Sequence, residues 1–271
     1  MDFIDVPPMQ DALPAAGTRV KQTAPEYAGT KVHHSLYLPK NWFRGEQFPV
    51  MVEYAGNYSL LHGCTGEVGD AALGYGLSQG IDFIWVVFPF ISNDHQTNQL
   101  TWWGDEKETV EYCRRNIYRI CNEFGGDTSR IILCGFSRGS IAVNYIGLYD
   151  DDISKLWHAF ITHDHYDGER LWANSYWGSP LEEYRKRAEA RLNRLNGRPA
   201  LVMQAQDPLL IYDYLKEKLH YAEFTFMVIP IKELFPEIPN EVFFNSHTDR
   251  WLLAETFYSR KAREWLKAHN K

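Results

Sequence analysis

The chain has 271 residues, of which 45% are hydrophobic and 23% charged, an ordinary balance for a globular protein with a large core. The formal net charge is −7 and no run of Lys or Arg offsets it. This argues against a nucleic-acid partner, because binding phosphates requires a basic surface. No stretch approaches the ~20 apolar residues that span a bilayer, so we expect no membrane partner either.

The first ten residues do not have the pattern of a secretory signal. They carry two acidic residues, Asp2 and Asp5, and no basic region followed by an apolar one. The expectation for the chain as written is a cytoplasmic protein. A signal removed ahead of this start would leave a secreted origin open.

Hydrophobic periodicity predicts alternating strands and helices after an irregular lead-in over residues 1–29. In chain order the expected elements are strand 31–38, strand 48–54, helix 65–79, strand 81–88, helix 105–124, strand 130–134, helix 141–148, strand 156–162, helix 181–195, strand 200–205, helix 209–221, strand 224–231 and helix 251–269. This alternation predicts one α/β domain over 30–271, with a mostly parallel central sheet and helices on both faces. Ligands of such sheets bind outside the carboxyl ends of the strands, so residues that follow each strand are candidates for a site.

The most specific motif is the segment 135–139, Gly-Phe-Ser-Arg-Gly, which follows the strand 130–134 and precedes a helix. The pattern G-x-S-x-G in this context is typical of a nucleophile elbow, where a tight turn lifts the serine above the sheet. Small residues are required two places before and after the serine, because side chains there would collide with the neighbouring strand and helix. The sequence therefore predicts Ser137 as a nucleophile.

The segment 127–139, DTSRIILCGFSRG, resembles the elbow region of the α/β-hydrolase superfamily. It is most similar to the esterase and polyester-depolymerase-like branch, where Asp-x-x-Arg often precedes the elbow strand. The resemblance in strand order covers about residues 31–270, whereas the motif match is local. It implies the α/β-hydrolase fold, a serine esterase, and a triad in the chain order Ser, acid, His; we expect no cofactor.

A serine hydroxyl becomes a good nucleophile when a histidine takes its proton and a carboxylate orients that histidine. We expect His247 as the base, because it follows the last predicted strand in a polar loop before the final helix. Asp207 follows the strand 200–205, where relatives of this fold carry the acid, so we expect it to complete the triad. Asp164 or Asp167 is the alternative acid.

These two alternatives belong to the cluster 163–167, His-Asp-His-Tyr-Asp, which ends the strand after the elbow helix. Two histidines and two carboxylates also suggest a metal site, but the spacing places no third ligand, so we expect no metal. Contact with the substrate by His165 or Tyr166 is the preferred interpretation. Trp102 and Trp103 fall in a predicted loop and are further candidates for contact with the substrate, although loop tryptophans also pack loops down.

An oxyanion hole requires two backbone N–H groups that point at the developing negative charge. One is expected from Arg138, the residue after the nucleophile. The other is expected from Asn57, since the segment 55–57, Ala-Gly-Asn, follows the strand 48–54 where relatives often carry His-Gly-Gly. The segment 62–64, His-Gly-Cys, resembles that motif too but lies too far past the strand.

Together these residues predict a carboxylic-ester hydrolase that works through an acyl-enzyme on a small-molecule or polymer-borne ester. Two other interpretations stay open. A peptidase or amidase would use the same triad, and a non-catalytic binding protein would keep the fold without the chemistry.

Overall fold

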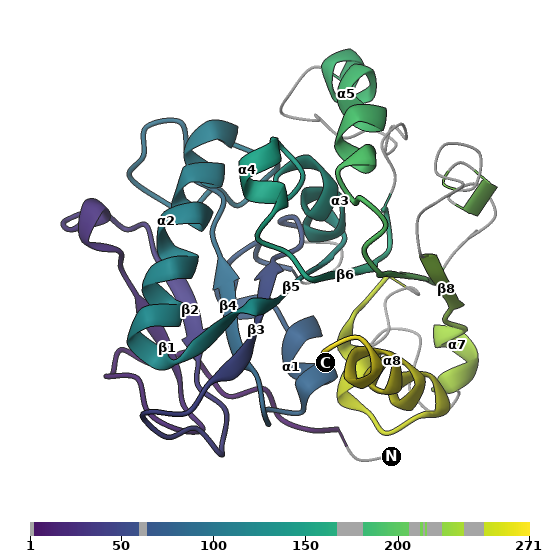
Figure 1. Cartoon of the computed structure of the whole chain (residues 1–271), viewed down its shortest axis with the longest axis horizontal. Coiled ribbons are helices and arrows are strands. Elements are labelled where there is room, and N and C mark those ends of the chain that lie inside the picture. Colours follow the sequence, from purple (N-terminus) through teal and green to yellow (C-terminus); the bar gives the residue numbers. More distant parts are fainter. Residues whose placement is uncertain are drawn as a thin grey trace.

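The computed structural model describes residues 3–59, 64–166, 181–205, 212–213, 215, 224–235 and 247–271. They form an eight-stranded sheet with helices on both faces (Figure 1). The strand order is β1-β2-β4-β3-β5-β6-β7-β8. The pairs β1–β2 and β2–β4 are antiparallel, and all the other neighbouring strands are parallel. The expected α/β architecture with a mostly parallel sheet is confirmed.

The strands are β1 Arg19–Gln22, β2 His34–Tyr37, β3 Phe48–Tyr54, β4 Ile84–Phe88, β5 Gly126–Phe136, β6 Ala159–His163, β7 Ala200–Gln204 and β8 Phe224–Val228. The helices are η1 Pro25–Tyr27, η3 Val68–Asp70, α1 Leu73–Ser78, α2 Glu106–Phe124, α3 Arg138–Tyr145, α4 Asp151–Ser154, α5 Leu181–Asn193, α7 Ile231–Leu234, η4 Arg250–Leu253 and α8 Phe257–Ala268, where η denotes a 3₁₀ helix.

Alternation along the strands separates two apolar cores, one on each face of the sheet. Along β3, Val50 and Val52 face a core shared with α2 and α3, whereas Met51 faces a core shared with α1, η4 and α8. Both faces are therefore buried, and the central strands have the nearly continuous apolar sequences that a covered parallel sheet requires. Figure 1 shows α2, α3, α4 and α5 on one side of the sheet and α1 and α8 on the other.

The long helix α2 illustrates how local sequence sets the element boundaries. The Asp105 side chain accepts a hydrogen bond from the Glu108 N–H and caps the first turn. Gly125 ends the helix in the left-handed conformation (φ 77°), which a residue without a Cβ adopts at little cost. The next residue already begins β5, the strand that carries the elbow.

Two differences from the sequence expectation concern the ends of the chain. The edge strand β1 lies inside the expected lead-in, where its four residues pair with β2. The expected helix 251–269 is split into η4 and α8, because Thr256 starts a new helix with a capping box to Ser259. Most of the expected helix 209–221 lies outside the described residues.

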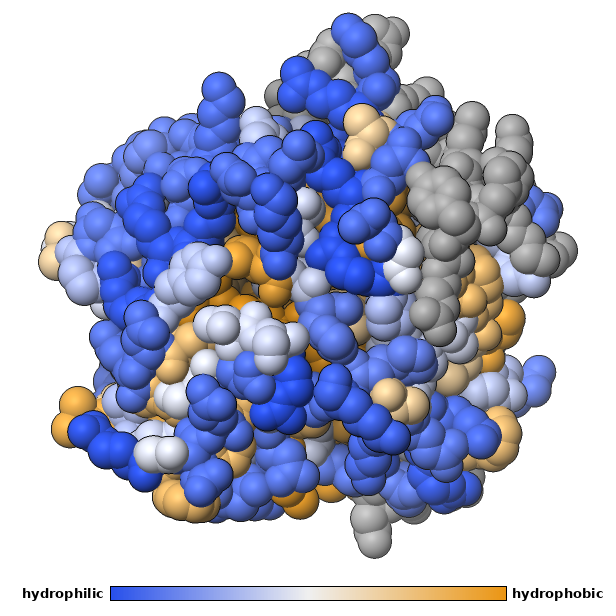
Figure 2. All heavy atoms as spheres, in the orientation of Figure 1, coloured by the Kyte–Doolittle hydropathy of each residue, from blue (hydrophilic) through white to orange (hydrophobic). Residues whose placement is uncertain are grey.

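The exterior in Figure 2 is mostly hydrophilic, and hydrophobic residues are exposed near the edge strand β8. This agrees with the burial of β8, whose residues are only half-buried and whose Val228 is 51% exposed. No described helix is both long enough and apolar enough to cross a bilayer.

Candidate active site

Ser137 lies in a sharp turn between β5 and α3. Its backbone has φ 57° and ψ −119°, an unusual conformation for a residue with a side chain. A Cβ at Gly135 would overlap the backbone of Gly139, and one at Gly139 would overlap the carbonyl oxygen of Tyr54. Both glycines are therefore required sterically, as a nucleophile elbow predicts.

Ser137 is hydrogen-bonded to His247, with 2.9 Å between Oγ and Nε2. Ser137 is 9% exposed and lies at the carboxyl end of β5. Its backbone N–H donates to the carbonyl oxygen of His163 at 3.0 Å, which ties the turn to β6. A serine in contact with an imidazole nitrogen can lose its proton as it attacks a carbonyl carbon.

The carboxylate that orients this imidazole belongs to Asp164. His247 Nδ1 lies 2.9 Å from Asp164 Oδ2, and the side chain of Asp164 is 2% exposed. Its other oxygen accepts a hydrogen bond from the Ala205 N–H at 2.8 Å. Ser137, His247 and Asp164 thus form a continuous hydrogen-bonded chain, the arrangement of a charge-stabilised general base.

The electrostatic surroundings keep Asp164 ionised. Burial alone would raise the pKa of this carboxyl group. The neighbouring His163, the hydrogen bond from His247 and the positive potential of His247 and His165 outweigh burial and lower the pKa to about 2. A buried carboxylate that stays charged can stabilise an imidazolium next to it.

The expected acid, Asp207, lies outside the described residues. His247 presents a single Nδ1, and the carboxylate bonded to it is Asp164, the alternative left open by the sequence. Asp164 follows β6, the direct neighbour of β5, whereas β7 is one strand further away. An acid that follows β6 therefore starts closer to the elbow than one that follows β7. Asp167 also lies outside the described residues.

His163 is a buried residue of the site to which the sequence assigned no role of its own. It ends β6 and is fully buried. Its Nε2 lies 2.8 Å from the carbonyl oxygen of Thr248 and 2.9 Å from Trp251 Nε1, and the tautomer decides which of these contacts is the hydrogen bond. His163 therefore ties β6 to the segment that carries His247. The signal in the sequence was its place in the His-Asp-His cluster, but its partners lie 85 and 88 residues further along.

Two aromatic rings pack against the imidazole of His247. The ring of His165 stacks on it with 4.5 Å between centroids and 25° between planes. The ring of Phe136 lies 4.7 Å away at 38°. Both Asp164 and His165 have positive φ values, 56° and 67°, so the turn that brings them to His247 is locally strained.

The expected oxyanion residues lie on either side of the elbow. Arg138 is the first residue of α3, and Asn57 belongs to the segment after β3. A Cβ on Gly56 would lie 3.8 Å from the carbonyl oxygen of Phe136, so that segment runs against the elbow. Among the described residues, neither the Arg138 N–H nor the Asn57 N–H donates a hydrogen bond to a protein group. Both donors are thus available for an oxyanion.

The aromatic residues expected to contact the substrate are mostly buried. Trp103 is 0% exposed and packs in the core against Phe90 and Tyr145, as in the loop-packing alternative that the sequence left open. Trp102 and Tyr166 are 6% and 1% exposed. Apolar packing of the loop accounts for all three, whereas His165 lies beside His247.

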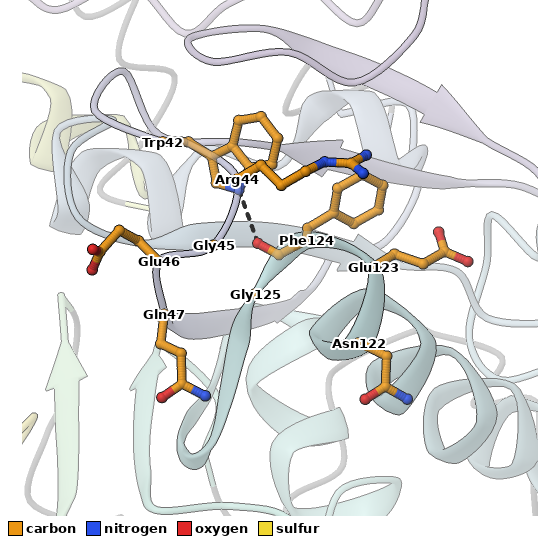
Figure 3. A pocket seen from close by; sticks show the side chains of 9 residues that line it. All are labelled: Trp42, Arg44, Gly45, Glu46, Gln47, Asn122, Glu123, Phe124 and Gly125. Carbon is orange, nitrogen blue, oxygen red and sulfur yellow. Dashed lines mark hydrogen bonds between the residues drawn. The ribbon is translucent and has the colours of Figure 1, made fainter.

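A separate pocket lies at the amino ends of the central strands β3 and β5 (Figure 3). It is lined by Trp42 and residues 44–47 before β3, and by residues 122–125 at the end of α2. Trp42 Nε1–H donates to the carbonyl oxygen of Phe124 at 2.8 Å and links the two segments that line the pocket. Because β3 and β5 begin here and Ser137 follows the far end of β5, this pocket is not part of the candidate active site. No group of three or more His, Cys, Asp or Glu side chains in the described segments could hold a metal ion.

Comparisons with solved structures show the fold. No protein-family model matches the chain, and no curated protein matches its sequence. An S-formylglutathione hydrolase from Agrobacterium tumefaciens is similar in structure, with a TM-score of 0.57, 15% identity and coverage of 93% of each chain. A thermostable esterase has a TM-score of 0.56 and 15% identity, with 92% of this chain and 62% of that chain covered. The chain has the α/β-hydrolase fold.

The isopeptidase AtxE2 is also similar, with a TM-score of 0.52 and 14% identity, and 93% of this chain and 43% of that chain are covered. The chain thus spans less than two thirds of the length of the thermostable esterase and of this isopeptidase. Hydrolases of different bonds share the fold, so the fold alone does not select the bond.

Proposed function

We propose that this protein is a serine hydrolase that cleaves carboxylic esters through an acyl-enzyme. The observation that carries the proposal is the hydrogen-bonded chain from Ser137 through His247 to Asp164, at 2.9 Å for each step. It stands at the carboxyl end of the parallel strands, where ligands of such sheets bind. Solved structures of similar fold include esterases.

In the first half of the proposed reaction, His247 Nε2 takes the proton of Ser137 as Oγ attacks the ester carbonyl carbon. The carbonyl oxygen becomes negative and is stabilised by the N–H groups of Asn57 and Arg138. The bond to the alcohol oxygen then breaks, and His247 returns the proton to the leaving alcohol. An acyl group remains on Ser137.

In the second half, water takes the place of the alcohol. The water oxygen attacks the acyl carbon while His247 accepts a proton from the water. The N–H groups of Asn57 and Arg138 stabilise the second oxyanion. The carboxylic acid leaves as Ser137 regains its proton from His247. Asp164 stays ionised throughout and stabilises the positive charge on His247.

The substrate proposed is a small-molecule or polymer-borne ester, with the esterase and polyester-depolymerase-like branch as the nearest resemblance. An amidase or peptidase reaction is the second candidate, because the isopeptidase shares the fold. An ester is favoured because its alcohol leaves more readily than an amine does. Turnover of paired ester and amide substrates with the same acyl group separates the two.

The decisive experiment combines turnover of p-nitrophenyl acetate with labelling by a fluorophosphonate and mapping of the adduct. We expect one adduct on Ser137 and a loss of turnover of about 10⁴-fold or more in Ser137→Ala, since the nucleophile is gone. Ser140→Ala is the matched control: this hydroxyl lies one turn along α3, is fully buried and has no hydrogen-bond partner among the described residues. Full turnover in Ser137→Ala would contradict the proposal, and no labelling of folded protein would favour a binding protein.

A further inference from the structure

The side chain of Arg138, the residue after the nucleophile, is 1% exposed and surrounded by backbone carbonyl groups. Its guanidinium donates hydrogen bonds to five carbonyl oxygens, those of Gly56 (2.9 Å), Trp102 (2.9 Å), Gln99 (3.1 Å), Gly66 (3.2 Å) and Ala55 (3.5 Å). The acceptors belong to two segments, with residues 55, 56 and 66 after β3 and residues 99 and 102 after β4. One side chain thus holds both segments against the start of α3.

This guanidinium is held without a carboxylate. Its carbon lies 4.0 Å from the centroid of the Phe90 ring, and no acidic group of the described chain lies within ion-pair distance. Burial lowers the pKa of Arg138 to about 9, although nearby Cys64 and Glu67 act in the opposite direction. Arginine suits this site because its donors diverge in a rigid planar fork, which a lysine ammonium cannot reproduce.

The bond to Gly56 has a consequence for the next N–H group. The carbonyl of Gly56 and the N–H of Asn57 belong to one planar trans peptide, so they point in opposite directions. The guanidinium fixes the carbonyl at 2.9 Å and therefore fixes the direction of the Asn57 N–H. A second link supports the same peptide: Asn57 Oδ1 accepts from the Trp102 N–H at 2.8 Å, and the Trp102 carbonyl is itself bound to Arg138.

We propose that the Arg138 side chain is a positioning residue that orients the Asn57 N–H toward the oxyanion, a role that rests on the proposed hydrolase function. The backbone N–H of Arg138 supplies one donor, and its side chain aligns the other. The whole oxyanion hole is then set by one residue of the elbow motif.

Arg19 is a matched control within the same chain. It is also 1% exposed, and it donates to the carbonyl oxygens of Val68 (2.8 Å), Gly69 (3.0 Å) and Ala71 (3.4 Å). Its carbon lies 4.3 Å from the centroid of the Trp85 ring. The chemistry is similar, but Arg19 is in the edge strand β1 and holds the segment around η3 instead of the elbow loops.

The test compares Arg138→Lys and Arg138→Gln with Arg19→Lys. Lysine keeps the charge, and glutamine removes it, but neither bridges five carbonyls. We expect kcat for p-nitrophenyl acetate to fall about 100-fold in both Arg138 variants, the size of the loss of one oxyanion donor, with KM changed less than about threefold. Arg19→Lys should lose thermal stability to a similar degree yet keep kcat within about twofold. Wild-type kcat in folded Arg138→Lys would overturn the proposal, as would an equal loss of kcat in Arg19→Lys.

Hydrogen exchange separates failure of this proposal from failure of the proposed function. We expect amides 55–58 and 99–102 to exchange faster in Arg138→Lys but not in Arg19→Lys. If the wild type turns over no ester, the hydrolase proposal fails, and exchange alone then decides whether Arg138 holds these segments. If neither Arg138 variant folds, hydrogen exchange of the wild-type protein still tests the proposal. The amides of both segments should then exchange with the same free energy of opening, because one side chain holds both segments. Different free energies of opening for the two segments would overturn the proposal.

Discussion

Two buried carboxylates lie on either side of β5, and their pKa values move in opposite directions. Glu53 in β3 is 1% exposed and accepts hydrogen bonds from Trp85 Nε1 and from the Gly74 N–H, both at 2.8 Å. Burial and the charge of Asp249 raise its pKa to about 7. Asp164 after β6 is equally buried, but its pKa is lowered to about 2.

The difference shows that burial alone does not set the charge of an acid. Glu53 has another acid among its neighbours, whereas Asp164 lies among three histidines. Only Asp164 is therefore held as an anion well below neutral pH. The Glu53 carboxyl group instead fixes the start of α1, where it binds the N–H groups of Leu73 and Gly74.

The largest effect expected from this comparison is on catalysis. Asp164→Asn keeps the shape of the side chain but loses the charge that stabilises imidazolium, so we expect kcat to fall about 10⁴-fold. Asp207→Asn, at the position first expected for the acid, should change kcat less than about threefold. Measuring kcat for both variants with one ester decides between the two; a large loss in Asp207→Asn alone would reverse the assignment.

The second effect is on stability. The folded-state pKa of Glu53 is raised from 4.5 to about 7, so the folded protein binds more protons than the unfolded chain in that range. Its stability contribution is present below pH 4.5 and is lost as the pH rises through 7. The glutamine in Glu53→Gln does not titrate, so the variant does not lose this contribution. The free energy of unfolding of the variant, relative to that of the wild type, should therefore rise by about 3 kcal/mol from pH 4.5 to pH 8. Urea unfolding of both proteins at several pH values measures this difference. A difference in free energy of unfolding that does not change with pH would contradict the prediction.

The smallest effect concerns the ring stacked on His247. His165→Ala removes one of the two rings that restrain the imidazole, and we expect kcat to fall about tenfold with little change in KM. His165→Phe keeps a ring without a titratable group and should stay near wild type. Equal losses in both variants would show that the imidazole of His165 has a chemical role instead of a packing role.

The sequence predicted well those features that local pattern determines. The strand β3 has the expected bounds, and the elbow is recognisable because two glycines and an apolar strand flank Ser137. The edge strand β1 was missed because it has only four residues, two of them exposed or half-exposed. It is a strand because it pairs with β2, and its own sequence does not show this.

The features that the sequence left open or missed depend on contacts between distant segments. Asp164 and Asp207 both follow predicted strands, so the sequence left Asp164 as the alternative acid, and its contact with His247 joins residues 83 positions apart. Trp103 looks like a loop residue, yet Phe90 and Tyr145 bury it. The hydrogen bonds of the Arg138 side chain could not be predicted, because their acceptors are backbone carbonyl groups, which every residue has.

The hydrogen bonds that link Ser137, His247 and Asp164 join residues far apart along the chain. Ser137 and His247 are 110 residues apart, and Asp164 and His247 are 83 apart. Closing such long loops costs entropy that is recovered only when the sheet and its covering helices have formed. During refolding, reactivity of Ser137 toward a fluorophosphonate should therefore return with the final native packing, after the bulk of the helical signal, and would serve as a kinetic marker for the last step of folding.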